Sequence, residues 1–161
     1  MRRNVRDIHG CLEQLSRLLE TVGFRPGRDE LWSAGDMIGR GPDPVGVLRL
    51  VRELGGRAVI GNHEFGAFMT WAGLREKRSP PLEPLYAAPD ADELLRWIRD
   101  LPALKHLAAE NGGRDAWLVH GGIRPYWDDL PVAAARLNRT PRPLDEFRSD
   151  ELMFATFARC C

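Results

Sequence analysis

The stretch RDIHGC, residues 6–11, places an aspartate and a histidine two positions apart after a short apolar lead. Three later stretches also set polar residues and glycine after a short apolar run: GDMIGRG at 35–41, GNHE at 61–64 and HGG at 120–122. In α/β sheets, ligands bind beyond the carboxyl ends of the strands. If the four strands are parallel neighbours in one sheet, we expect these polar clusters to meet at one edge.

Helical and extended patterns alternate along the chain. Apolar spacing predicts helices over 12–22, 45–54, 62 to about 71, 90–101 and 131–138. Short apolar runs predict strands over 3–5, 30–34, 57–60 and 116–119. Asp90 precedes Glu93 by three residues, which is the spacing of a capping box. Residues 75–89 contain four prolines and predict a surface loop, and 139–143 predict a linker.

Composition narrows the class of protein. A chain of 161 residues that is 43% hydrophobic is long enough for one globular domain with a core. The 23 basic and 23 acidic residues balance, so net charge gives no argument for binding nucleic acid or an anionic membrane. No apolar run is long enough for a spanning helix or a secretory signal. Three cysteines, two of them at 160–161, make no disulfide framework, so we expect a cytoplasmic protein.

The polar clusters contain oxygen and imidazole donors, which suit Mn, Fe, Zn, Ni or Co. The candidate ligands are Asp7, His9, Asp36, Asn62, His63 and His120. One aspartate can bridge two ions, and ions about 3.5–4 Å apart can activate a water and polarise a phosphoryl group. Arg40 follows Asp36 by four residues, so its guanidinium could hold phosphate oxygens.

Each candidate alone also has a structural interpretation. Asp36 could form an Asx turn, Asn62 could tolerate a left-handed turn, and a single histidine could be a hydrogen-bonded core residue. Their joint occurrence at strand ends beside glycine favours a metal site. His106 lies outside any such junction, and we assign it no role. The five tryptophans are expected in or near the core rather than in a base-stacking surface.

The four blocks, in this order, resemble the signature of calcineurin-like metallophosphoesterases, and of the phosphoprotein phosphatase branch among them. More narrowly, the chain is similar to symmetrical bis(5′-nucleosyl)-tetraphosphatases. The supporting stretches are residues 22–32, 39–55, 85–102 and 118–128. Ser/Thr protein phosphatases usually carry an aspartate at the position of Gly39, where it orients the catalytic histidine. Glycine there favours the nucleotide hydrolases.

The resemblance implies a sandwich of two mixed β-sheets flanked by helices, in a single domain over residues 1–161. It implies two divalent ions, most simply Mn, with Fe, Zn, Co, Ni or Mg as alternatives. The implied roles are as follows: Asp7 and His9 hold the first ion, Asp36 bridges, Asn62 and His120 hold the second, His63 is the general acid, and Arg40 and Asn62 bind substrate. A metal-bound hydroxide would attack phosphorus, converting diadenosine tetraphosphate to two ADP. The implied partner is therefore a small nucleotide, with neither nucleic acid nor membrane.

Three features depart from the family pattern, and one is the short first strand, where Arg3 and Asn4 stand in place of an apolar run. Arg6 stands where the family usually has glycine, so a charged side chain could crowd the first ion or strain the turn. Family members are longer and carry a further histidine near their C-terminus, whereas no histidine follows His120 here. We therefore expect a C-terminally short chain with an incomplete second sheet. Two alternatives stay open: a Ser/Thr protein phosphatase, or a catalytically weak metal- or nucleotide-binding remnant.

Overall fold

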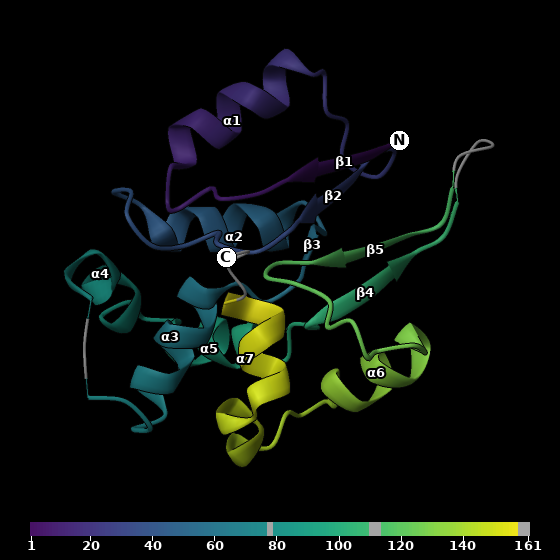
Figure 1. Cartoon of the computed structure of the whole chain (residues 1–161). Helices are drawn as coiled ribbons and strands as arrows, with labels where there is room; N and C mark the ends of the chain where they lie inside the picture. Colours follow the sequence, from purple (N-terminus) through teal and green to yellow (C-terminus); the bar gives the residue numbers. More distant parts are fainter. Residues whose placement is uncertain (77–78, 110–113, 158–161) are drawn as a thin grey trace.

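The computed structural model describes residues 1–76, 79–109 and 114–157. Figure 1 shows the elements in chain order. They are β1 (Arg2–Val5), α1 (Leu12–Thr21), β2 (Glu30–Ser33), α2 (Pro44–Glu53), β3 (Arg57–Ala58), α3 (Asn62–Trp71), η1 (Pro80–Leu82), α4 (Glu83–Tyr86), α5 (Ala91–Arg99), β4 (Leu104–Leu107), β5 (Ala116–Val119), α6 (Leu130–Leu137), η2 (Leu144–Arg148) and α7 (Asp150–Phe157). Within these ranges, no helix has the length and apolar character needed to cross a membrane. Cys160 and Cys161 lie outside the described residues.

The first sheet contains β1, β2 and β3 in that order, and both strand pairs are parallel. Parallel neighbours need a long crossover connection, which α1 and α2 supply here. The central strand, β2, buries Leu31, Trp32 and Ser33, as the apolar run in its sequence predicts. Because the three strands run in one direction, their carboxyl ends lie at the same edge. The polar turns that follow them therefore start close together.

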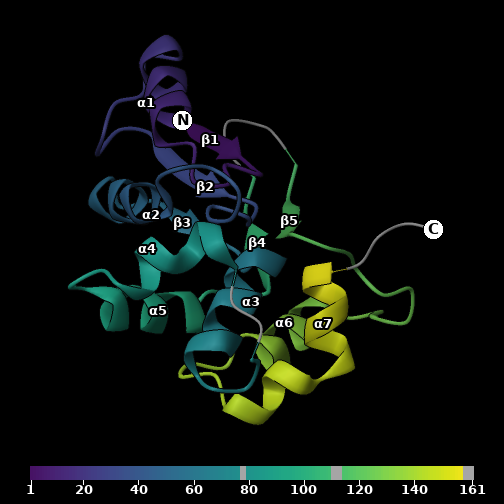
Figure 2. The same cartoon turned by 90° about the vertical axis from the view of Figure 1, so that its left-hand side faces the viewer.

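The second sheet consists of β4 and β5, which are antiparallel and pair Leu104 with Val119 and Leu107 with Ala116. Figure 2 shows the first sheet between the α1–α2 layer and this second sheet. Residues 116–119 are therefore not a parallel neighbour of the other three strands, so the condition of a single parallel sheet is not met. Its partner, β4, was not predicted because Lys105 and His106 separate its two buried leucines. The pairing pattern within each described sheet is uniform rather than mixed.

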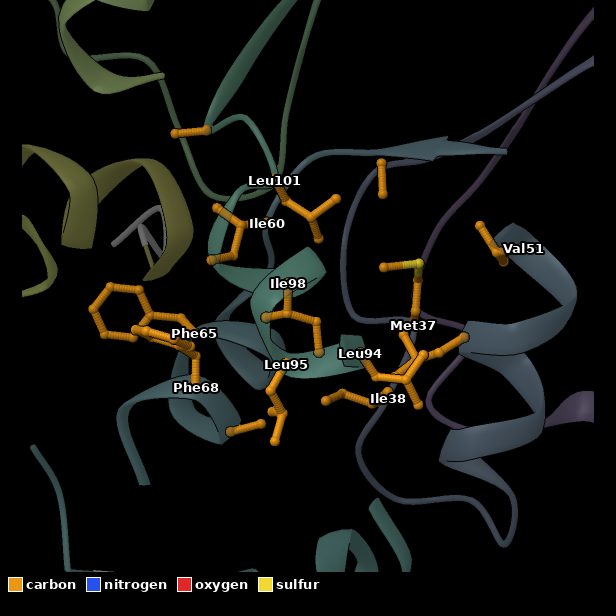
Figure 3. Close-up of a cluster of buried hydrophobic side chains, with 14 of the residues drawn as sticks. Met37, Ile38, Val51, Ile60, Phe65, Phe68, Leu94, Leu95, Ile98 and Leu101 are labelled. Carbon is orange, nitrogen blue, oxygen red and sulfur yellow. The ribbon is translucent and has the colours of Figure 1, made fainter. Parts of the chain in front are cut away.

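The core lies where α2, α3 and α5 meet the turns after the first sheet (Figure 3). Leu94, Leu95 and Ile98 of α5 are fully buried, as their helical spacing predicts, and α5 packs on α3. Burying a side chain of this size stabilises a fold by about 1.5–3 kcal/mol. Trp32 and Trp127 are buried and the other tryptophans partly so, consistent with the expected core role.

Two local predictions are wrong because contacts between residues far apart in the sequence determine the structure there. The expected loop over 75–89 contains η1 and α4, and these bury Leu82 and Leu85. Asp90 does not cap α5 with its side chain. Its carboxylate instead accepts two hydrogen bonds, 3.0 and 2.6 Å long, from the guanidinium of Arg49 on α2. This bidentate pair directs the carboxylate away from the helix end, and its hydrogen bonds lower the pKa of Asp90.

The expected linker over 139–143 contains a buried cation. Arg142 is only 2% exposed, and it donates hydrogen bonds to the carbonyls of Arg99, Leu101 and Leu137. Arg99 and Leu137 are the last residues of α5 and α6, where carbonyl groups lack partners inside the helix. Burial lowers the pKa of Arg142 to about 10, so the side chain stays charged at neutral pH. One guanidinium thus donates to the last carbonyl of each of two helices.

Replacing Arg142 with alanine should lower the free energy of unfolding by about 2 kcal/mol, because buried carbonyls would lose their donor. Arg139→Ala is the matched control, since Arg139 is exposed and forms a surface ion pair with Glu146. That change should cost less than about 0.5 kcal/mol. Urea denaturation followed by circular dichroism measures both. Equal midpoints for the Arg142→Ala variant and the unaltered chain would contradict this account.

Candidate metal centre

All seven polar side chains singled out from the sequence line one cavity of about 310 Å³. They are Asp7, His9, Asp36, Arg40, Asn62, His63 and His120. The first six lie in the turns after β1, β2 and β3, or at the start of α3. His120 follows β5, so it reaches the cavity from the second sheet. The four blocks therefore converge as expected, although they come from two sheets.

Three of these residues have an uncommon backbone conformation. Asp7, His9 and Asp36 have φ values of 52°, 53° and 53°, in the left-handed region that is unfavourable for side chains other than glycine. Hydrogen bonds between the two turns hold this geometry, since His9 N–H donates to Asp36 and Gly10 N–H donates to Met37, at 2.8 and 2.7 Å. Such strain persists only where surrounding structure fixes it, and it is concentrated at functional sites.

The donor atoms around His120 fit a cation. Its Nδ1 lies 2.8 Å from the carbonyl oxygen of Ala34, which can only accept, so Nδ1 carries the proton. In a neutral ring, Nε2 then presents a lone pair to Asn62 Oδ1 at 3.1 Å and Asp36 Oδ1 at 3.5 Å. Three electron-rich atoms this close repel one another unless a positive charge lies between them. A metal ion would supply that charge, and a backbone carbonyl often orients a ligating histidine in this way.

Asp36 is shared by two groups of potential ligands. In each group the donor atoms lie within 4.8 Å of one another, and the groups are His9–Asp36–His63 and Asp7–Asp36–His120. Asp36 is 5% exposed, with Oδ1 toward His120 and Oδ2 3.9 Å from His63 Nε2. This arrangement can accommodate two ions joined by one carboxylate. By distance, Asp7 lies with His120 and His9 with His63, whereas the family pattern pairs Asp7 with His9.

His63 is fixed by close backbone packing. Its ring meets that of His9 edge to face, with centroids 4.8 Å apart. A Cβ atom on Gly39 would lie 2.5 Å from His63 Nδ1, and Gly39 has a φ of 145°, so the position requires glycine. Burial is the main influence on the pKa of His63 and lowers it, against the raising effect of Asp36. The carboxylate that faces His63 is therefore that of Asp36 rather than one at position 39.

Glu64 is a site residue to which sequence reasoning gave no role, although it belongs to the GNHE block. It is fully buried, and its carboxylate accepts hydrogen bonds from the N–H groups of Asp36, Ile38 and Gly61 at 2.8–3.0 Å. Burial and the nearby Asp36 raise the pKa of Glu64 to about 7, while these three N–H groups act to lower it. Its place at the third position of α3, after Gly61, is the capping-box signal that could have identified it.

Three further residues considered in the sequence, Arg6, Arg40 and His106, belong to neither group of potential ligands. The Arg6 side chain points to solvent, 80% exposed, with Nε 3.5 Å from Asp7 Oδ2. The left-handed backbone falls on Asp7 and His9 rather than on Arg6, so the expected strain at Arg6 is absent. Arg40 is an exposed residue that lines the cavity. His106 is outside the cavity and pairs with Asp115 on the surface, consistent with its having no role.

The cavity combines shared carboxylate and imidazole donors with an arginine, and this is the composition of a metal-dependent phosphoesterase site. The sequence profile of the calcineurin-like phosphoesterase family matches residues 7–157, so this chain belongs to that family. The membership and the layered α/β fold inferred from the sequence are both confirmed.

Similar proteins narrow the relationship. The chain is 44% identical over 132 residues to the symmetrical bis(5′-nucleosyl)-tetraphosphatase of Cronobacter sakazakii (strain ATCC BAA-894), covering 80% of this chain and 45% of that protein. It is 46% identical over 134 residues to the protein of that name from Pectobacterium atrosepticum, with the same coverage. A solved structure described as a candidate diadenosine tetraphosphatase aligns with a TM-score of 0.65 at 29% identity, over 89% of this chain and 53% of the other. The chain therefore spans about half the length of the curated relatives it matches.

Replacing Glu64 with glutamine should weaken both the fold and metal binding. A glutamine NH₂ group would face backbone N–H groups where a carboxylate oxygen now accepts, leaving at least one buried donor without a partner. The expected loss is about 2 kcal/mol in the free energy of unfolding. Bound manganese after dialysis, measured by elemental analysis, should also fall. Glu53→Gln, at an exposed position of α2, is the control and should match the unaltered chain. Unchanged stability and metal content in Glu64→Gln would refute this role.

Proposed function

We propose that this chain hydrolyses dinucleoside polyphosphates with two divalent metal ions, converting diadenosine tetraphosphate to two ADP. The observation that carries the proposal is the buried Asp36 carboxylate shared by two groups of donors in one cavity. The names of relatives that are 44–46% identical support the choice of substrate. Oxygen and imidazole donors without thiolate support Mn²⁺ as the ion, with Fe, Zn, Co, Ni or Mg as alternatives.

The proposed ligands are Asp7, His9, Asp36, Asn62 and His120. Once bound, two divalent ions would lower the pKa of a water and polarise the phosphoryl group. Arg40, at the cavity, would bind non-bridging phosphate oxygens through its planar guanidinium, together with the Asn62 amide. His63 would give a proton from its ring to the bridging oxygen that leaves with ADP, as the water oxygen bonds to the phosphorus of the other half.

Position 39 supports a nucleotide hydrolase over a Ser/Thr protein phosphatase. A side chain at this position would overlap the rings of His63 and His9, within 2.5–2.9 Å. The aspartate that orients the catalytic histidine in protein phosphatases therefore has no room here. His63 instead faces Asp36. A protein phosphatase would require the His63 ring to move.

The direct test is hydrolysis by the purified chain loaded with Mn²⁺. We expect it to release ADP from diadenosine tetraphosphate faster than it releases phosphate from a phosphothreonine peptide, as measured by chromatography and a phosphate assay. Faster turnover of the peptide would reverse the choice of substrate. Negligible turnover of both, with one metal or none per chain, would favour a catalytically weak remnant.

Replacing Asp36 with asparagine should abolish the binding of both ions and lower any hydrolytic rate at least 100-fold. The shared carboxylate would lose its charge and one oxygen ligand. Elemental analysis of the dialysed protein and the ADP-release assay measure the two effects. His106→Ala is the control, since His106 lies on the surface outside the cavity, and it should leave both values unchanged. Similar losses in the two variants would contradict the site assignment.

A further inference from the structure

A second cleft of about 330 Å³ adjoins the metal cavity. Both spaces are lined by Asn62, His63 and Phe157, so they adjoin at these residues. The second cleft continues along α3 toward the segment that contains η1 and α4. His63 stands where the two spaces meet. A ligand whose phosphorus lies in the metal cavity can therefore extend past His63 into this cleft.

The floor of the second cleft is one face of α3. His63, Gly66, Ala67 and Thr70 line it at helical spacing, and at 1.5 Å per residue the face extends about 10 Å from His63. Glycine inside a helix is unfavourable in conformational entropy, so its use at position 66 needs a local reason. A Cβ atom there would lie 3.1 Å from Nη1 of Arg75. The missing side chain leaves room for this guanidinium against the helix.

The walls of the cleft combine a positive charge with aromatic and apolar surface. Arg75 is exposed, and the described part of the chain offers it no ion-pair partner. No acidic side chain lines the described cleft, so an anion beside Arg75 meets no like charge. The aromatic rings of Tyr86 and Phe157 line the same space, together with Leu82. A guanidinium binds phosphate oxygens, and flat apolar walls bind the face of a base.

We propose that this cleft binds the nucleoside diphosphate that leaves during hydrolysis, with Arg75 holding its phosphates and the aromatic wall holding its base. The inference rests on the proposed function, because it assigns the cleft to one half of that substrate. The position of His63 between the two spaces is the geometric reason for choosing the leaving half. A proton from its ring would reach the oxygen that joins the two halves. Arg75 is thus a substrate-binding residue outside the metal centre.

The test compares binding of ADP and of inorganic phosphate to the Mn²⁺-loaded chain by calorimetry. We expect Arg75→Ala to weaken ADP binding at least tenfold and to leave phosphate binding unchanged, since phosphate alone fits the metal cavity. Arg75→Lys should recover part of the ADP affinity. Arg17→Ala, on the exposed surface of α1, is the control and should bind both ligands normally. Unchanged ADP affinity in Arg75→Ala, or no ADP binding by the unaltered chain, would overturn the inference.

Kinetics separates this inference from the proposed function. Arg75→Ala should raise KM for diadenosine tetraphosphate at least tenfold with little change in kcat, and hydrolysis of p-nitrophenyl phosphate should not change. If the unaltered chain and Arg75→Ala hydrolyse the dinucleotide with the same KM, the cleft assignment is refuted and the proposed function stands. A chain that binds ADP through Arg75 but does not hydrolyse the dinucleotide would refute the proposed function and keep the nucleotide cleft.

Discussion

The buried carboxylate of Glu64 is the interaction on which the rest of the site depends. It joins the turn after β2, through the N–H groups of Asp36 and Ile38, to the start of α3 at Gly61. Burying a carboxylate is unfavourable unless hydrogen bonds replace its water, and here three backbone donors do so. The orientation of Asp36 relative to His63 is therefore set by backbone contacts, before any ion binds.

Hydrogen bonds between the turns explain how their strained residues persist. Asp7, His9 and Asp36 all occupy the left-handed region, which costs of order 1–3 kcal/mol for each residue. The turns after β1 and β2 hydrogen-bond to each other, so neither can relax alone. Holding these electron-rich side chains close together therefore lowers the free energy of unfolding that the core provides. This mutual repulsion is what bound cations would relieve, so the arrangement of these side chains favours metal binding over the stability of the fold alone.

The sequence predicted those features that neighbouring residues determine. Asp36 and His120 could be placed because each follows a short apolar strand beside glycine, and the common edge of a sheet brings such positions together. The pairing of β5 could not be predicted, because its partner β4 interrupts its apolar residues with charge. Contacts across long separations were also missed. The partner of Asp90 is 41 positions away, and Glu64 acts on a turn 28 positions away. Local patterns carry no information about which of several polar partners will be near in space.

The guanidinium of Arg142 has a consequence for how the structure opens. Because this guanidinium is buried, water cannot replace the carbonyls to which it donates. Two of these are the last carbonyls of α5 and α6. Unwinding the end of either helix would leave the buried charge of Arg142 with fewer hydrogen-bond partners. The arginine would then hold the end of the other helix less firmly, so the two ends open together. The two helix ends should therefore exchange their amide hydrogens as a single cooperative unit, although Arg99 and Leu137 are 38 positions apart in the chain.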